Sequence, residues 1–183
     1  MYRTLCICAL EPRLVTRSRL VLLVHYREAR KPTNTGQLAA RCLVGSRVAI
    51  VGDRDRPLPV PLVDPAEHAV LLYPGDGAVP LAATDRPTTV IVPDGNWRQA
   101  AKMGRRVPGL DQLPRVTLDD PRPTEYRLRA EPRTDGLATL EAIARAWRIL
   151  EGEAGPAIEA ALLDIFRVMV ARTLALRGQR AER

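Results

Sequence analysis

Short apolar runs recur along the chain and constrain its fold more than any other feature of the sequence. Each run is rich in valine, isoleucine or leucine and is bounded by glycine, proline or aspartate. Nearly continuous apolar runs are typical of strands that a parallel sheet buries on both faces. We therefore predict five strands, over Leu20–Val24, Val48–Val51, Val70–Tyr73, Thr89–Val92 and Arg115–Leu118.

Helical patterns separate these runs and close the chain. One helix is expected over Thr35–Val44, after a Pro-Thr-Asn start signal, and another over Asn96–Val107. Apolar residues at helical spacing predict two further helices, over 137–150 and 158–176. Strands that alternate with helices indicate the α/β class, here with a mostly parallel sheet flanked by helices. A length of 183 residues fits a single domain over 1–183.

The net charge of +7 is carried almost entirely by arginine, because Lys31 and Lys102 are the only lysines. Arginine pairs bidentately with phosphate and stacks on bases, so this balance favours a polyanionic partner. An Ala- and Arg-rich composition can equally reflect GC-rich coding, and charge alone leaves both interpretations open. No apolar run approaches the roughly 18 residues of a membrane span, and no signal-peptide core is visible. We expect a cytoplasmic protein.

The three cysteines do not form a disulfide framework or a complete metal site in the sequence. Cys6 and Cys8 could offer two thiolates to zinc, but a structural zinc needs four ligands. Cys42 falls in an expected helix and is predicted to lie in the core. The sequence therefore predicts no bound metal.

Polar residues at the ends of the predicted strands are the candidates for chemistry, because ligands of open α/β sheets bind there. Asp94 follows an apolar run and opens a helix, so it is a helix cap, with Asn96 as the rival cap, or a general base or cation anchor. Trp97 could stack on a purine or pack in the core, and His25 could be structural. No Walker A loop and no G-x-G-x-x-G follows a strand, which argues against nucleotide triphosphates and dinucleotides.

Four of these segments resemble, in order, motifs of the DTW-domain family of tRNA-uridine aminocarboxypropyltransferases. The family's His-Glu segment with Asn-Thr-Gly is similar to residues 25–28 and 34–36, and its Pro-Gly loop is similar to 73–75. Its Asp-x-Thr-Trp resembles 94–97, while its Tyr-x-Leu-Arg and Leu-Ser-Thr-x-Glu-Ala resemble 126–129 and 137–142. The chain departs from the family at two positions: Asn96 replaces a threonine and Ala138 replaces a serine.

The resemblance implies a SPOUT-type fold with a trefoil knot, S-adenosylmethionine as donor, and transfer of its 3-amino-3-carboxypropyl group to N3 of a tRNA uridine. It implies that Asp94 accepts the N3 proton, with Trp97 and Asn96 beside it. The cofactor-binding residues it implies are Tyr73, Pro74, Gly75, Val92, Pro93, Asp94, Leu128, Arg129 and Thr139. For tRNA it implies His25, Glu28, Arg30, Asn34, Thr35, Arg98, Lys102 and Arg127. The family usually has two further cysteines before its Cys-x-Cys; here five residues precede Cys6, so no zinc is expected.

Three other interpretations stay open at this stage. A SPOUT methyltransferase acting on RNA would share the donor but transfer its methyl group. A catalytically silent RNA-binding protein would account for Asn96 and Ala138. An aminocarboxypropyl transferase acting on a small molecule would bind RNA no better than other basic proteins. No protein partner is predicted.

Overall fold

The computed structural model describes residues 6–53, 55, 57–58, 61–128, 136–176 and 178. The strands of this part of the chain are β1 (Arg19–His25), β2 (Arg47–Val51), β3 (Ala69–Leu72), β4 (Val79–Pro80), β5 (Thr89–Asp94) and β6 (Arg115–Thr117). They form one six-stranded sheet in the order β2-β1-β5-β3-β6-β4, and every pairing in it is parallel. The prediction of an α/β fold with a mostly parallel sheet is confirmed.

All five predicted strands are present, within one or two residues of their expected ends. The sixth strand, β4, was not predicted because both of its residues are exposed and one of them is proline, so no apolar run marks it. It pairs at the edge of the sheet with β6 alone, a place where a proline can be accommodated.

The four predicted helices are also present, as α1 (Thr35–Cys42), α2 (Trp97–Arg106), α3 (Thr139–Leu150) and α4 (Gly155–Leu176). Two single turns of 3-10 helix, η2 (Cys8–Leu10) and η3 (Gly152–Ala154), complete the elements of the described residues. In this part of the chain, no helix combines the length and the apolar character that a membrane span requires.

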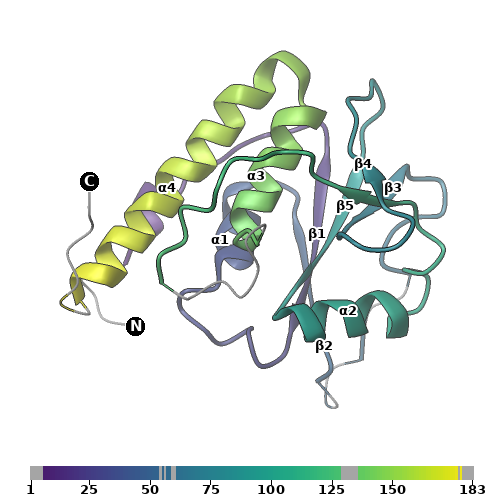
Figure 1. Cartoon of the computed structure of the whole chain (residues 1–183), viewed down its shortest axis with the longest axis horizontal. Coiled ribbons are helices and arrows are strands. Elements are labelled where there is room, and N and C mark those ends of the chain that lie inside the picture. Colours follow the sequence, from purple (N-terminus) through teal and green to yellow (C-terminus); the bar gives the residue numbers. More distant parts are fainter. Residues whose placement is uncertain are drawn as a thin grey trace.

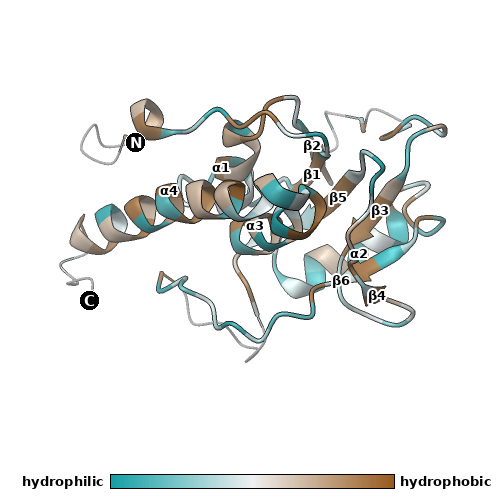
Figure 2. Ribbon diagram, turned by 90° about the horizontal axis from the view of Figure 1, so that it is seen from above, coloured by the Kyte–Doolittle hydropathy of each residue, from teal (hydrophilic) through white to brown (hydrophobic). Residues whose placement is uncertain are grey.

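Helices cover both faces of the sheet, and the side chains of β1 show how the two cores form. Leu22 and Val24 point to the larger core, which α1, α3 and α4 build on one face, the left-hand side of the sheet in Figure 1. Leu23 points to the opposite, smaller core, which contains Met103 of α2. Because successive residues of a strand alternate between faces, a run of apolar residues serves both cores. In the hydropathy colouring of Figure 2, the ribbons of β1, β3 and β5 are largely hydrophobic.

The order of the strands determines where a ligand can bind. From β1 the chain passes through α1 to β2 on one side, whereas β3 lies on the other side of β1 and β5 fills the place between them. Such a reversal of direction leaves a crevice at the carboxyl ends of the strands. The reversal lies between β1 and β5, and β3 and β6 follow β5 in the sheet. A ligand is therefore expected at the carboxyl ends of these neighbouring strands.

Candidate active site

A cavity of about 490 Å³ lies at the carboxyl ends of β3, β5 and β6. This volume is within the range of small-molecule sites, and the lining combines apolar side chains with a few polar ones, as is usual for such sites. The strand ends contribute Leu72, Val92 and Leu118. The rest of the lining comes from Glu28 and Thr35 before and at the start of α1, from residues 73–74 and 93–94, from the start of α2, from residues 120–126 and from the start of α3. We call this space the main cavity.

Asp94, the last residue of β5, is the most constrained polar residue of the main cavity. Its carboxyl group is buried, with 5% of the residue exposed. One carboxylate oxygen accepts a hydrogen bond from the Asn34 amide at 2.5 Å, and the other accepts one from the Thr139 hydroxyl at 2.5 Å. Buried carboxylates need such donors, because burial without them is costly. Asp94 thus connects β5 to the starts of α1 and α3.

Gly36 in the first turn of α1 makes this arrangement possible. A Cβ atom at this position would lie 3.1 Å from Cγ of Asp94 and 3.1 Å from Cγ2 of Thr139. These distances are closer than ordinary contacts, so a larger residue would push α1 away from the carboxylate. The glycine of the Asn-Thr-Gly segment therefore allows the close approach of α1 to Asp94.

Asp94 and Asn96 were the two candidates for the N-cap of α2, and the N-cap is Asn96. Its side chain accepts a hydrogen bond from the backbone N–H of Gln99 at 2.9 Å, and the Gln99 side chain accepts one from the backbone N–H of Asn96 at 2.8 Å. This reciprocal pair is a capping box. The carboxylate of Asp94 instead faces Asn34 and Thr139.

The start of α3 has only half of the same motif. The backbone N–H of Ala138 donates to the Glu141 carboxylate at 2.8 Å, as in a capping box. Ala138 occupies the N-cap position with extended backbone, but alanine has no side-chain oxygen to return the bond. One backbone N–H of the first turn is therefore without the partner that a serine would give it.

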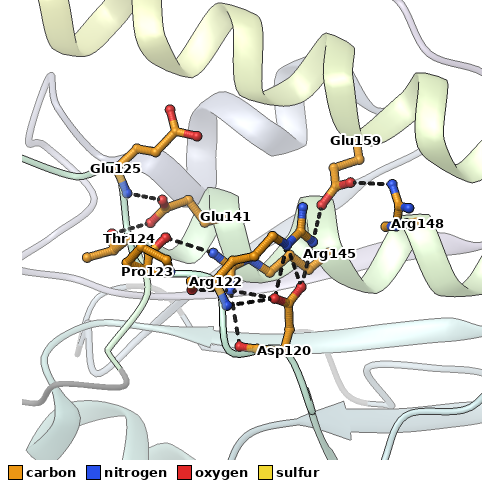
Figure 3. A network of polar contacts seen from close by, with 9 residues as sticks. All are labelled: Asp120, Arg122, Pro123, Thr124, Glu125, Glu141, Arg145, Arg148 and Glu159. Carbon is orange, nitrogen blue, oxygen red and sulfur yellow. Dashed lines mark hydrogen bonds and ion pairs between the residues drawn. The ribbon is translucent and has the colours of Figure 1, made fainter. Parts of the chain in front are cut away.

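One wall of the main cavity is an extended segment, residues 118–128, which we call the wall segment. Two buried residues of α3 bind it, as Figure 3 shows. Glu141 accepts hydrogen bonds from the Thr124 hydroxyl and the Glu125 backbone N–H, both at 2.6 Å. The guanidinium of Arg145 donates to the backbone carbonyls of Arg122 and Pro123, at 2.8 and 3.1 Å. The wall segment has no regular secondary structure of its own over 118–127, so these bonds position it.

Ion pairs extend these contacts toward α4. Arg122 pairs with Asp120 at 2.5 Å and with Glu159 at 2.7 Å, and Arg148 pairs with Glu159 at 3.0 Å. The hydrogen bonds from Arg122 lower the pKa of Asp120 to about 2, so its carboxylate stays ionised at neutral pH. The Arg122 and Arg148 side chains are about half exposed, so water weakens these pairs and each contributes little to stability.

A second, smaller cavity of about 190 Å³ adjoins the main cavity, and we call it the side cavity. Four residues line both cavities: Glu28, Thr35, Asp94 and Tyr126. Lys31, Thr33, Asn34 and Leu128 complete the lining of the side cavity.

The structure brings most of the predicted site residues together. Asn96 and Trp97 line the main cavity, as do six of the predicted cofactor-binding residues: Tyr73, Pro74, Val92, Pro93, Asp94 and Thr139. Leu128 lines the side cavity instead, Gly75 lines neither cavity, and Arg129 lies outside the described residues. The rings of Tyr73 and Trp97 lie 6.1 Å apart, centroid to centroid, on the same side of the main cavity as the start of α2.

The residues predicted to bind tRNA fall into two groups. Glu28, Asn34 and Thr35 line the cavities, whereas the basic residues and the histidine line neither of them: His25, Arg30, Arg98, Lys102 and Arg127. The four basic side chains of this second group are exposed. His25 is partly buried beside Tyr26, with ring centroids 4.8 Å apart, and this burial lowers its pKa. It is therefore neutral at physiological pH.

Sequence reasoning missed the residues that position the wall segment. Glu141 was named only as part of the motif at 137–142, and Arg145 was not predicted. A usable signal existed, since an acidic and a basic residue four apart lie on the same face of a helix. On α3 that face is otherwise occupied by buried residues, and only 1% of Glu141 and 5% of Arg145 are exposed.

The cysteines lie apart from both cavities. Cys42 is buried in the core, as predicted, and burial raises its pKa to about 11, so it remains a protonated thiol. Cys6 and Cys8 are exposed. Over the ranges that the structure describes, no three or more His, Cys, Asp or Glu side chains come together in a way that could hold a metal ion.

Comparison with known proteins places the chain in a family. The DTW domain model matches residues 1–174, so the chain belongs to the DTW-domain family. It is 29% identical over 143 residues to a protein of Drosophila melanogaster named tRNA-uridine aminocarboxypropyltransferase 2, a match covering 73% of this chain and 57% of the relative. Relatives of the same name in Mus musculus and Macaca fascicularis are 30% and 29% identical, each over 80% of this chain and 53% of their own length. The chain thus spans somewhat more than half of these relatives. No solved structure matches it.

The half-formed capping box of α3 predicts that Ala138→Ser stabilises the protein. A serine hydroxyl can accept the backbone N–H of Glu141, which raises the free energy of unfolding by about 1 kcal/mol. Denaturant unfolding followed by circular dichroism measures this. Ala138→Cys, which is close to serine in size but has only a weakly accepting sulfur, is the control, and an unchanged or lower stability of the serine variant would contradict this account of the α3 cap.

The contacts of Arg145 predict that Arg145→Met releases the wall segment. Methionine keeps much of the side-chain volume but removes the donors to the partly buried carbonyls of Arg122 and Pro123, which lowers the free energy of unfolding by roughly 1 kcal/mol. Limited proteolysis and hydrogen exchange should show faster cleavage and exchange over residues 118–128. Arg148→Met, on the exposed side of the same helix, should change neither; equal effects of the two variants would show that Arg145 has no special role in the wall.

Proposed function

We propose that this protein transfers the 3-amino-3-carboxypropyl group of S-adenosylmethionine to N3 of a uridine in tRNA. Membership of the DTW-domain family and the name of the relatives support the proposal. The observation that carries it is the position of Asp94, a buried carboxylate at the junction of two cavities at the carboxyl ends of a parallel sheet. There it can face a cationic donor and an acidic N–H at once.

Asp94 accepts the proton in the proposed reaction. Bound S-adenosylmethionine supplies a sulfonium leaving group beside the carbon to be transferred. The N3–C bond forms as the C–S bond breaks, and the electron pair of the C–S bond returns to sulfur, which leaves 5′-methylthioadenosine. The N3 proton passes to Asp94, whose hydrogen bonds from Asn34 and Thr139 fix the carboxylate in position for this transfer.

The remaining predicted residues take the roles that their positions favour. In the main cavity, the aromatic rings of Tyr73 and Trp97 and the backbone of 92–94 contact the adenosine of the donor. Outside the cavities, exposed arginine and lysine side chains bind the tRNA backbone, and this binding weakens with salt. The basic residues concerned are Arg30, Arg98, Lys102 and Arg127, and His25 lies at the same end of the sheet.

Two further parts of the proposal follow from the family resemblance. The fold is of the SPOUT type, with a trefoil knot near the donor site, and Arg129 contributes to that site. The place of action is the cytoplasm, which suits a tRNA substrate and the three free cysteines.

The proposal is tested by incubating the purified protein with tRNA and S-adenosylmethionine, followed by mass spectrometry of the nucleosides. We expect a uridine that carries the aminocarboxypropyl group and release of 5′-methylthioadenosine. A methylated nucleoside with S-adenosylhomocysteine as by-product would instead identify a methyltransferase. Absence of any modified nucleoside despite donor binding would favour a silent RNA-binding protein.

Asp94→Asn is expected to slow the transfer about 10²- to 10⁴-fold, because the amide cannot accept the N3 proton. Asparagine keeps the shape and one acceptor oxygen for Asn34, its NH2 group can donate to the Thr139 hydroxyl, and Asn96 rather than Asp94 caps α2, so the fold is preserved. Transfer rates with saturating tRNA and donor, together with calorimetric binding of the donor, measure the two effects separately. Normal turnover would show that Asp94 is not the proton acceptor, and loss of donor binding would assign it to the donor instead.

A further inference from the structure

We infer that the side cavity binds the α-amino-acid end of the donor, with Lys31 for its carboxylate and Glu28 for its ammonium group. This inference rests on the proposed donor and specifies how its two halves divide between the cavities. The main cavity then receives the adenosine, and the sulfonium lies where the two cavities meet. Asp94 lines both cavities and so lies at that junction.

The charges around the side cavity are those that a zwitterion requires. Two acidic side chains line it, and both are buried: 7% of Glu28 and 5% of Asp94 are exposed. Among the described residues of its lining, Lys31 has the one basic side chain. The Glu28 carboxylate can accept hydrogen bonds from an ammonium group, and the half-exposed Lys31 side chain can donate to an anionic group.

The ion pair between Lys31 and Glu28 indicates how the two side chains would bind the ligand. The Lys31 ammonium lies 2.6 Å from the Glu28 carboxylate, and its side chain is 49% exposed. A long, half-exposed side chain can turn toward a ligand carboxylate at little cost, while Glu28 accepts from the ligand ammonium in its place. The hydroxyls of Thr33 and Thr35 line the same space and can add hydrogen bonds.

Other occupants fit this lining less well. A phosphate group would meet two buried carboxylates, which repel it. A uracil ring carries no charge and so forms no ion pair with Lys31 or Glu28. An α-amino acid offers an ammonium group to Glu28 and a carboxylate to Lys31. A cavity of about 190 Å³ admits a group of that size but not the whole donor.

The arrangement also accounts for which group is transferred. When the amino-acid end is fixed in the side cavity, its carbon next to sulfur lies at the junction beside Asp94, where the N3 proton is accepted. The residues of the side cavity would thus favour transfer of this carbon over transfer of the methyl group.

The test compares two ligands by calorimetry with the whole protein. S-adenosylhomocysteine keeps the amino-acid end, whereas 5′-methylthioadenosine has the same adenosine and sulfur without it. For the wild type we expect S-adenosylhomocysteine to bind more tightly. Lys31→Met and Glu28→Gln should each weaken its binding about tenfold to a hundredfold, while binding of 5′-methylthioadenosine changes less than about twofold.

The chain offers a matched control pair in Arg41 and Glu11. Their ion pair spans 2.9 Å, and their side chains are exposed to a similar degree, 50% and 12% against 49% and 9% for Lys31 and Glu28, but they line neither cavity. Arg41→Met and Glu11→Gln should leave binding of both ligands unchanged. Unchanged S-adenosylhomocysteine binding in the side-cavity variants, or equal weakening of both ligands, would overturn the inference. A wild type that binds neither ligand would overturn the proposed donor itself.

Discussion

The site depends on a buried carboxylate whose two oxygens must both be satisfied. Asp94 meets this requirement with the amide of Asn34 and the hydroxyl of Thr139, so α1 and α3 have to begin at the end of β5. A carboxylate left in the apolar interior without such donors would be strongly destabilising. The same two bonds that make its burial tolerable also place it at the junction of the two cavities. The local fold and the position of Asp94, the proposed reactive group, therefore depend on the same hydrogen bonds.

Helix α3 connects Asp94 to the wall segment on the opposite side of the main cavity. Thr139 donates to Asp94, while Glu141 and Arg145, two and six residues further along the helix, bond the wall segment. A single rigid helix therefore fixes the distance between the strand ends and the wall, although the wall segment has little regular structure of its own. Buried charged groups that bond backbone groups act here as positioning elements, and their value lies in geometry more than in net stability.

Much of the fold, but less of the site, was predictable from the sequence. Strands and helices can be predicted from the local pattern of apolar residues. The apolar strands β1 and β5 were therefore predicted, and the exposed β4 was not. The contacts of Asp94 join residues 60 and 45 positions apart, and no local pattern encodes such pairs. The family resemblance supplied the members of the site, whereas the division into two cavities and the role of Arg145 required the three-dimensional arrangement.

The two departures from the family motifs have a common physical meaning. Asn96 and Ala138 both occupy N-cap positions, the first of α2 and the second of α3. Threonine and asparagine are both good caps, so Asn96 preserves the function that its position performs. Alanine in place of serine at Ala138 removes one cap bond, whereas the hydrogen bonds that Asn34 and Thr139 donate to Asp94 do not involve Ala138. The departures therefore bear on helix stability rather than on Asp94, the proposed proton acceptor, and they give little support to a catalytically silent protein.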